Sequence, residues 1–340
     1  MNILIIGGTR FIGPFLVRQL VESGHDVTLF HRGETEARLP ETVAHLHGDR
    51  YQLPDHQSQF NDIKPDIVID MMIRFGWQAK DLMKVFSGLA RRVVMISSAD
   101  VYRNMGILRG SETGEIYPDR MSEDAPLRDK LYPYRSEAKS PDEWMYEYDK
   151  IPAEQEVLSD PKLPGTVLRL PMVYGPGDPQ HRLFDYFKRM RDSRPAILLD
   201  REHMRARWIR GYVENVAAAI VLSATDDRAA GKIYNVGEPE ALTEDTWVRA
   251  IGDTVGWTGE IIGLPHGELP KHLQTSYNFK AHLDVDTSRL RSELGYTEPI
   301  THEEALDRTV SWEMVNPPPA IKHEDFNYAA EDSVLSSFKR

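Results

Sequence analysis

Tyr146 and Lys150 are the two side chains whose types and spacing point most directly to proton chemistry, because they stand four positions apart. Ser140, followed by a proline and a glutamate in the pattern of a capping box, predicts the start of a helix that carries both on one face. An ammonium group stabilises a nearby phenolate, so the tyrosine oxygen can take a hydroxyl proton while hydride leaves the same carbon. Tyr148 is expected on another face of this helix, away from Lys150.

A glycine-rich turn, Gly7-Gly8-Thr9-Arg10-Phe11-Ile12-Gly13, follows the first apolar run of the chain and precedes a helical pattern. Glycines at such a place let backbone N–H groups approach a pyrophosphate at the positive end of a helix. Arg10 stands where a middle glycine is usual, while Gly7 and Gly13 mark the tight turn and the packing point of the helix. The segment therefore predicts a dinucleotide-binding site.

The second apolar run ends in His31-Arg32-Gly33 and offers no acidic side chain to hold the adenosine ribose hydroxyls. Arg32, with Arg10 nearby in the expected fold, can accept a ribose 2′-phosphate, which favours NADP over NAD. The alternative, that Arg32 is only a surface arginine, stays open. Asp49 is expected to bind the adenine amino group or simply to form a turn. The residues predicted to bind NAD(P) are Gly7, Thr9, Arg10, Phe11, Ile12, Gly13, His31, Arg32, Asp49, Met72 and Pro171.

Short apolar runs alternate with helix-length stretches, at residues 3–6, 27–30, 67–70, 93–96, 167–170 and 233–236. This alternation predicts an α/β fold with a doubly wound parallel Rossmann sheet, with ligands at the carboxyl ends of the strands. We expect the Rossmann domain to comprise residues 1–171 and about 208–237. A smaller mixed α/β substrate lobe would comprise about 172–207 and 238–316, and residues 317–340 would form an extended polar tail.

Several segments together resemble those of the extended short-chain dehydrogenases/reductases, the family of nucleotide-sugar epimerases and dehydratases. They are the glycine turn and residues 97–102, 146–154, 168–177, 235–237 and 286–296. The resemblance covers nearly all of residues 1–312. It implies an NAD(P)-dependent enzyme that takes hydride from a nucleotide-linked sugar and returns it after epimerisation or dehydration. A homodimer is also implied, because dimers are common in this family.

The same resemblance assigns roles to individual residues. Tyr146 would be the general acid/base, Lys150 would also hold the nicotinamide ribose, and Ser98 would hydrogen-bond the substrate oxygen. In relatives that dehydrate or decarboxylate a keto-sugar, an acid stands two positions before the tyrosine that ends the serine motif, as Asp100 stands before Tyr102. Asp100 would then be a second acid/base. Its alternative role is to cap the following turn.

The chain departs from the family pattern between Ser98 and Tyr146, which are separated by about twice the usual stretch. This implies an insertion at residues 103–140 that forms a lid or a longer wall of the active site. Pro152 lies just after Lys150, where it should kink the helix or start a new one.

For the second lobe, the residues predicted to contact a diphosphate are Arg182, Arg207 and Arg210. A metal site is not predicted: His45 and His47 could ligate a metal, but no third ligand stands at suitable spacing, so a surface loop is expected there. The alternative for the arginines, a solvated or ion-paired face, stays open.

The composition limits the class of protein. The chain has 340 residues, no cysteine and a net charge of −12, which weakens any case for binding the phosphate backbone of nucleic acids. The first apolar run is too short for a membrane span and lacks the flanks of a signal peptide. We therefore expect a cytoplasmic protein with neither a nucleic-acid nor a membrane partner.

Two other functions remain under consideration. The turn Gly-Gly-Thr-Arg-Phe-Ile-Gly and the segment His31-Arg32-Gly33 also resemble chloroplast stem-loop RNA-binding relatives, which keep the fold for binding. The third possibility is a carbonyl reductase that consumes free NADPH. Net consumption of the cofactor would distinguish this reductase from a redox-neutral isomerase or dehydratase.

Overall fold

The computed structural model describes residues 1–35 and 37–338. At its centre is a seven-stranded parallel sheet in the order β11-β6-β5-β4-β1-β2-β3. Its strands are β1 (Asn2–Ile6), β2 (Asp26–His31), β3 (Ala44–His47), β4 (Ile67–Asp70), β5 (Arg92–Ser98), β6 (Gly165–Leu170) and β11 (Ile233–Asn235). The predicted doubly wound parallel sheet is therefore confirmed.

Helices cover both faces of this sheet, as the near-continuous apolar strands require. In β1, Ile3 and Ile5 pack on one face, beneath α1 (Ile12–Glu22) and α9 (Val213–Thr225). Leu4 and Ile6 pack on the other face, beneath α3 (Gly76–Phe86) and α6 (Lys150–Val157). Helix α2 (Gln57–Ile63) lies on this face as well. Strand order reverses between β1 and β4, so a crevice opens at their carboxyl ends.

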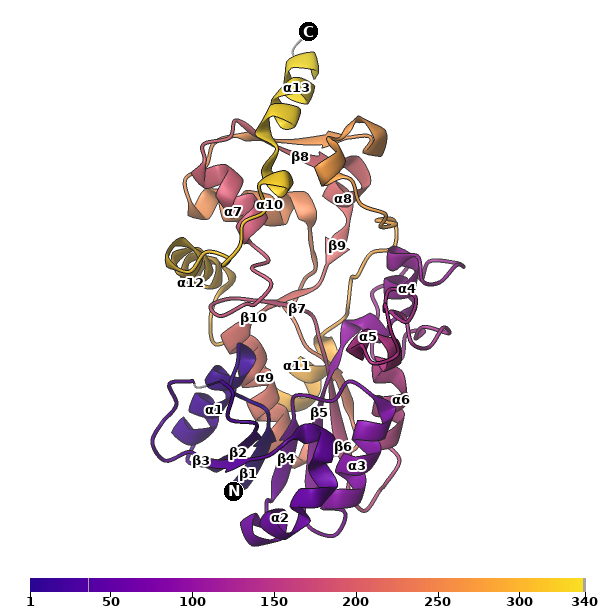
Figure 1. Cartoon of the computed structure of the whole chain (residues 1–340), viewed down its shortest axis with the longest axis vertical. Coiled ribbons are helices and arrows are strands. Elements are labelled where there is room, and N and C mark those ends of the chain that lie inside the picture. Colours follow the sequence, from indigo (N-terminus) through magenta and orange to yellow (C-terminus); the bar gives the residue numbers. More distant parts are fainter. Residues whose placement is uncertain (36, 339–340) are drawn as a thin grey trace.

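The second half of the molecule contains three small two-stranded sheets and lies above the central sheet in Figure 1. The pairs are β7 (Met172–Tyr174) with β10 (Arg210–Tyr212), β8 (Ala196–Asp200) with β13 (Glu260–Leu264), and β9 (Arg207–Trp208) with β12 (Leu242–Thr243). Its helices are α7 (Phe184–Arg191), α8 (Arg201–Arg205), α10 (Glu244–Thr254) and α12 (His302–Val315). We expected α11 (Ser288–Leu294) here as well, but it packs against β11 at the edge of the central sheet.

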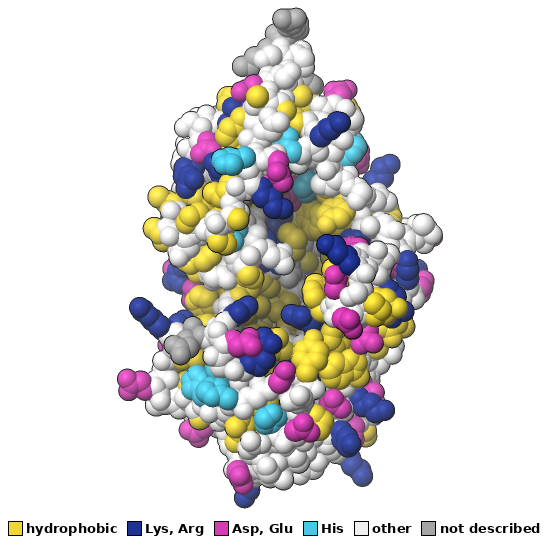
Figure 2. All heavy atoms as spheres, viewed as in Figure 1, with side chains coloured by type: hydrophobic (Ala, Val, Ile, Leu, Met, Phe, Trp, Pro, Cys, Tyr) yellow, Lys and Arg dark blue, Asp and Glu magenta, His cyan; other side chains and the backbone are white. Residues whose placement is uncertain are grey.

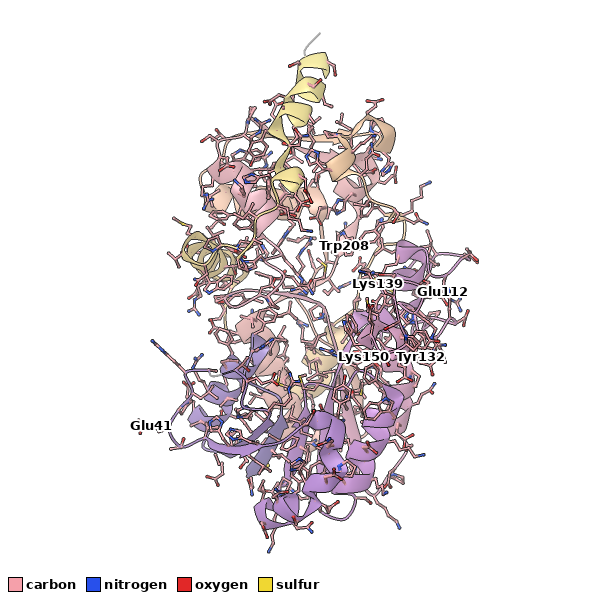
Figure 3. The ribbon with its side chains drawn as sticks, viewed as in Figure 1. Glu41, Glu112, Tyr132, Lys139, Lys150 and Trp208 are labelled. Carbon is pink, nitrogen blue, oxygen red and sulfur yellow. The ribbon has the colours of Figure 1, made fainter. Side chains whose placement is uncertain are left out.

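A hollow separates the two halves, and apolar, lysine and arginine side chains gather along it (Figure 2). In Figure 3, Lys150 lies on the sheet side of this hollow and Trp208 on the side of the second half. The site residues should therefore be sought along these two walls.

The insertion at residues 103–140 forms a packed wall. It contains α4 (Arg103–Arg109) and a long irregular stretch that precedes α5 (Trp144–Glu147). Backbone hydrogen bonds tie it to the second half, from the Met121 N–H to the Asp284 carbonyl at 2.8 Å and from the Asn278 N–H to the Leu108 carbonyl at 2.8 Å. These contacts anchor the insertion to the second half of the molecule.

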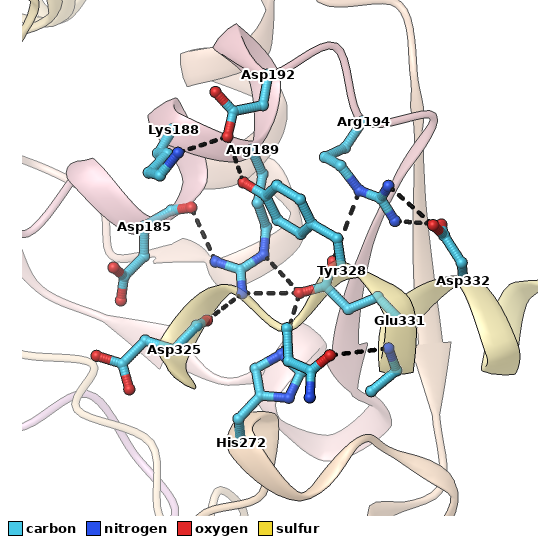
Figure 4. Close-up of polar contacts among 12 residues, drawn as sticks. Asp185, Lys188, Arg189, Asp192, Arg194, His272, Asp325, Tyr328, Glu331 and Asp332 are labelled. Carbon is cyan, nitrogen blue, oxygen red and sulfur yellow. Dashed lines mark hydrogen bonds and ion pairs between the residues drawn. The ribbon is translucent and has the colours of Figure 1, made fainter. Parts of the chain in front are cut away.

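The C-terminal segment is folded, so the prediction of an extended tail was wrong. It forms a short 3₁₀ helix at His323–Phe326 and the helix α13 (Tyr328–Phe338). Glu331 is buried and accepts hydrogen bonds from Arg189 Nε at 3.1 Å and Nη2 at 2.9 Å (Figure 4). Asp332 of the same helix pairs with Arg194, just after α7. Local polarity does not reveal such long-range pairs. None of the helices in residues 1–35 and 37–338 is both long and apolar enough to cross a membrane.

Candidate functional site

The glycine turn borders a cavity of about 450 Å³ at the carboxyl ends of β1, β2 and β4. Gly7 and Gly8 adopt φ of +93° and +90°, and a Cβ on Gly7 would lie 2.9 Å from Met72 Cγ. The first turn of α1 has no side-chain cap at Phe11, which leaves its N–H groups available to an anion. The predicted cofactor residues on the cavity wall are Gly7, Thr9, Arg10, Phe11, Ile12, His31, Arg32, Asp49 and Met72.

Two predicted cofactor residues lie outside this cavity. Gly13 packs against the Gly8 backbone, where a Cβ would come within 2.3 Å of the carbonyl carbon. Its role is therefore the close packing of turn and helix that the sequence indicated. Pro171 instead faces Gly211, where an added Cβ would lie 2.9 Å from its ring.

His31 and Asp49 hold the backbone of the cavity rim. His31 Nδ1 accepts the Gly33 N–H at 3.1 Å, and its Nε2 lies 2.8 Å from His45 Nδ1. Asp49 accepts the Tyr51 N–H at 2.9 Å, which is the turn-forming role left open above. His45 belongs to β3 together with His47, so the loop expected around these two histidines was wrong. The structure shows no group of three or more potential metal ligands within residues 1–35 and 37–338.

Sequence reasoning missed a buried ion pair beneath the cavity. Arg50 Nε lies 2.7 Å from Asp70 Oδ2, and Asp70 Oδ1 accepts the Met72 N–H at 2.8 Å. The pair fixes the end of β4 at the switch point of the sheet. An acid that ends an otherwise apolar run was the available signal, but its arginine partner is distant in sequence.

Lys150 lies at the carboxyl ends of β4 and β5. It is 8% exposed, and its Nζ donates to the carbonyls of Ile73 and Ile96, the latter at 3.0 Å. Burial lowers the pKa of Lys150 to about 8, against the opposing effect of Asp100 and Asp70. The ammonium group is thus fixed at the edge of the sheet where ligands bind.

The prediction that Tyr146 and Lys150 share one helix face was wrong. Helix α5 ends at Glu147, Tyr148 and Asp149 are extended, and α6 begins at Lys150. Tyr146 packs against Arg135, whose guanidinium carbon lies 4.7 Å from the ring centroid.

The new helix begins where it does because Asp149 caps it. Its carboxylate accepts the Ile151 N–H at 2.9 Å and the Tyr132 N–H at 2.7 Å. Pro152 lies in the first turn of α6, where the missing N–H costs nothing, so the alternative of a new helix is the one observed. Ser140 lies in a turn before α5 and does not cap the helix, as had been expected.

Tyr148 reaches the centre that Tyr146 was expected to occupy, which corrects our expectation that Tyr148 faces elsewhere. Its hydroxyl donates to Asp100 Oδ2 at 2.8 Å, and the Tyr134 hydroxyl donates to the same oxygen at 3.1 Å. Burial raises the pKa of Asp100, although Arg128 and Lys150 oppose this effect. Burial and the Asp100 charge also raise the pKa of Tyr148, so its hydroxyl stays protonated.

Ser98 stands beside this group at the end of β5. Its Oγ accepts the Asp100 N–H at 3.2 Å and so caps the short 3₁₀ helix that follows. The capping role considered for Asp100 therefore belongs to Ser98. Tyr102 points elsewhere, because its hydroxyl donates to Asn235 Oδ1 at 2.6 Å.

A second cavity, of about 530 Å³, lies in the second half of the molecule and includes Arg182 and Arg210 in its wall. Arg210 Nη2 lies 2.5 Å from Glu244 Oε2, and its guanidinium stacks 4.4 Å from the Trp247 ring. Arg182 lies 2.6 Å from Asp178. Arg207 lies outside this wall and donates to the Ala241 carbonyl at 2.9 Å. The three arginines predicted to contact a diphosphate are therefore engaged in contacts within the protein.

Comparisons with known proteins agree with this arrangement. The sequence model of the NAD dependent epimerase/dehydratase family matches residues 3–237. The chain is 26% identical to chloroplast stem-loop binding protein of 41 kDa b from Arabidopsis thaliana, over 98% of this chain and 84% of that protein. It is also 26% identical to 2-alkyl-3-oxoalkanoate reductase from Stenotrophomonas maltophilia, over 100% and 98% of the two chains. The structure of dTDP-glucose 4,6-dehydratase from Bacillus anthracis with NAD superposes with a TM-score of 0.69 at 18% identity, covering 93% of this chain and 97% of that one.

Proposed function

Because the chain belongs to the NAD-dependent epimerase/dehydratase family, we propose that it oxidises a nucleotide-linked sugar transiently and returns the hydride after epimerisation or elimination. The observation that carries this proposal is the position of Lys150, Ser98 and Asp100. They lie at the carboxyl ends of the strands next to the glycine-turn cavity. A dinucleotide in that cavity would extend toward these three residues.

The cavity fits NAD(P) by its chemistry. The uncapped N-terminus of α1 offers N–H groups to the pyrophosphate, and Gly7 has no Cβ to obstruct it. Arg10 and Arg32 lie on the wall and would hold a ribose 2′-phosphate, so we propose NADP as the preferred form. The bound nicotinamide would supply the acceptor and later the donor of hydride.

The side chains near Lys150 would handle the protons. The Lys150 ammonium would hold hydroxyls of the cofactor ribose, and Ser98 would orient the oxygen of the substrate. Asp100 would exchange a proton next to the carbonyl that oxidation creates. Tyr148 belongs to this centre as a residue that holds Asp100, because its hydroxyl donates to Asp100 Oδ2. The Asp100 carboxylate would take the hydroxyl proton of the substrate as hydride leaves for the nicotinamide.

The second cavity would hold the nucleotide part of the substrate. Arg182 and Arg210 line it, and Arg207 lies on the neighbouring strand β9. A diphosphate there would have to share these arginines with Asp178 and Glu244, since Arg182 and Arg210 already pair with those acids. We also propose a homodimer, which light scattering on the purified chain would test.

The deciding experiment incubates the enzyme and cofactor with a panel of nucleotide sugars in D₂O. Dehydration gives a product about 17 daltons lighter, because water is lost and one solvent deuteron replaces the abstracted proton. Deuterium uptake without loss of water indicates deprotonation and epimerisation next to the carbonyl. A new epimer without deuterium, resolved by chromatography, indicates inversion at the carbon that loses and regains the hydride. Asp100→Asn is the matched variant and should bind cofactor but form no product. If the panel leaves every sugar unchanged, the proposed function is wrong.

Two further assays, one with NADPH and carbonyl substrates and one with stem-loop RNA, would indicate the alternatives. Stoichiometric consumption of NADPH would identify a carbonyl reductase, a reading favoured by the similarity to 2-alkyl-3-oxoalkanoate reductase. Salt-sensitive retention of stem-loop RNA without turnover would identify a binding protein, a reading favoured by the similarity to the chloroplast protein.

A further inference from the structure

Asp100 has two carboxyl oxygens in different surroundings. Oδ2 accepts the hydroxyls of Tyr134 at 3.1 Å and Tyr148 at 2.8 Å, and the two rings lie 5.2 Å apart. Oδ1 is buried and has no hydrogen-bond partner within residues 1–35 and 37–338. The whole residue is only 6% exposed. A buried carboxyl oxygen without a partner requires an explanation, and a functional role is one of the few available.

The insertion brings Tyr134 to this carboxyl group. Arg128 donates from Nε to the Asp100 carbonyl at 2.7 Å and forms a buried ion pair with Asp149 at 3.1 Å. The Tyr132 N–H also binds Asp149. These contacts fix the insertion just before Tyr134. Just after it, Arg135 Nε donates to the Tyr146 carbonyl at 3.0 Å, so the fold holds the Tyr134 hydroxyl in place.

The break between α5 and α6 brings the Tyr148 hydroxyl to Asp100. A continuous helix would have turned this side chain to another face, whereas the extended backbone at Tyr148 and Asp149 directs it to Asp100. Asp149 therefore supports both phenols, because it caps α6 after Tyr148 and binds the backbone two residues before Tyr134.

We propose that Tyr134 and Tyr148 form a clamp on Oδ2 of Asp100 that leaves Oδ1 as the oxygen that exchanges a proton with the substrate. The inference rests on the proposed function, in which Asp100 contacts the reacting carbon. Tyr134 and Tyr148 act through Asp100 and are positioning residues. The insertion at residues 103–140 is thereby part of the catalytic centre, since it supplies one of the two phenols.

The clamp predicts a change in the pKa of Asp100. The groups that face Asp100 are Tyr134 and Arg128 from the insertion, Tyr148 from the break between helices, and Lys150 from α6. Burial raises the pKa of Asp100, while hydrogen bonds from the two phenols stabilise the carboxylate and lower it. Loss of either hydroxyl should therefore raise this pKa further.

The test compares Tyr134→Phe and Tyr148→Phe with the wild-type chain. In each variant the acid limb of kcat/KM should move upward by about half to one pH unit, and kcat should fall about tenfold. Tyr146→Phe is the matched control, because that ring packs on Arg135 outside the clamp, and its pH profile should equal that of the wild type.

Titration of ¹³C-labelled aspartate by NMR measures the Asp100 pKa without any substrate, with Asp100→Asn identifying the signal. An upward shift in both phenylalanine variants supports the clamp. An unchanged Asp100 pKa in both variants overturns it, as does an unchanged acid limb in an enzyme that turns over. If the wild-type chain converts no sugar, the proposed function fails and the NMR titration alone decides whether the clamp exists.

Discussion

Arg128 and Asp149 form an ion pair that is shielded from solvent, with Nη2 3.1 Å from Oδ1 and both side chains 1% exposed. The pair joins the insertion to the break between α5 and α6 and so determines where Lys150 begins its helix. Through the Arg128 contact with the Asp100 carbonyl, it also fixes the end of β5. One interaction thus connects three segments that are distant in the sequence.

Replacing Asp149 with alanine should leave Arg128 as a buried charge without its partner. We expect the free energy of unfolding to fall by about 3–5 kcal/mol, because an uncompensated buried charge is costly. Urea denaturation followed by circular dichroism measures the change. Asp129→Asn is the matched control: it breaks the Arg103–Asp129 pair, in which the aspartate side chain is 82% exposed, and should cost at most about 1 kcal/mol. Equal losses in the two variants would contradict the structural role of Asp149.

The sequence predicted those features that local patterns determine. The apolar runs located strands of the central sheet, and the glycine turn located the cavity at the end of β1. The break at Tyr148 was missed because a tyrosine and a lysine four positions apart fit a helix equally well. At the break, Asp149 pairs with Arg128 of the insertion, which is 21 positions away in the sequence. A pairing between distant segments leaves no periodic signal in a single sequence.

Arg32→Gln should change the preference for cofactor. A charge-assisted contact with the 2′-phosphate would be lost, so the Kd for NADP should rise about tenfold while that for NAD stays constant. Arg32 also pairs with Glu34 at 2.8 Å, but both side chains are 58% exposed and the pair contributes little. Titration calorimetry with each cofactor measures both constants, and Glu34→Gln controls for loss of the pair alone. A parallel change in both affinities would remove Arg32 from 2′-phosphate recognition.

Lys150 should give turnover an alkaline limb. Burial lowers the pKa of Lys150 to about 8, so the ammonium group that holds the ribose is lost above that pH and kcat/KM should fall. Stability changes in the opposite direction. Between about pH 8 and 10.5 the unfolded chain keeps a proton that the folded chain has released, so the free energy of unfolding gains a contribution that rises with pH.

Lys150→Met separates this effect from other titrations. The variant should lose the contribution to stability that rises between about pH 8 and 10.5, as measured by urea denaturation at several pH values. Lys139→Met is the control, because Lys139 is exposed. The pKa assignment is wrong if the stability of the Lys150 variant follows the wild-type pH profile.

Glu331→Gln should destabilise the second half of the molecule. Glu331 is 1% exposed and accepts hydrogen bonds from Arg189, while His272 Nε2 lies 3.1 Å from the same oxygen. Removing the carboxylate charge leaves the buried Arg189 without its charged partner, so the free energy of unfolding should fall by about 3 kcal/mol.

Loss of the Arg189–Glu331 pair should also disturb the second cavity, because Arg189, His272 and Asp325 form part of its wall. Arg189 donates to the Asp325 carbonyl at 2.8 Å, so its displacement should loosen the C-terminal segment and weaken binding of any ligand in this cavity. Hydrogen exchange of α13 and denaturation by urea measure the two effects. Asp332→Asn removes the neighbouring pair with Arg194, in which Asp332 is 56% exposed. It should leave both the hydrogen exchange of α13 and the free energy of unfolding close to the wild-type values. If α13 exchanges its amide protons equally fast in Glu331→Gln and the wild type, the buried pair does not anchor this segment.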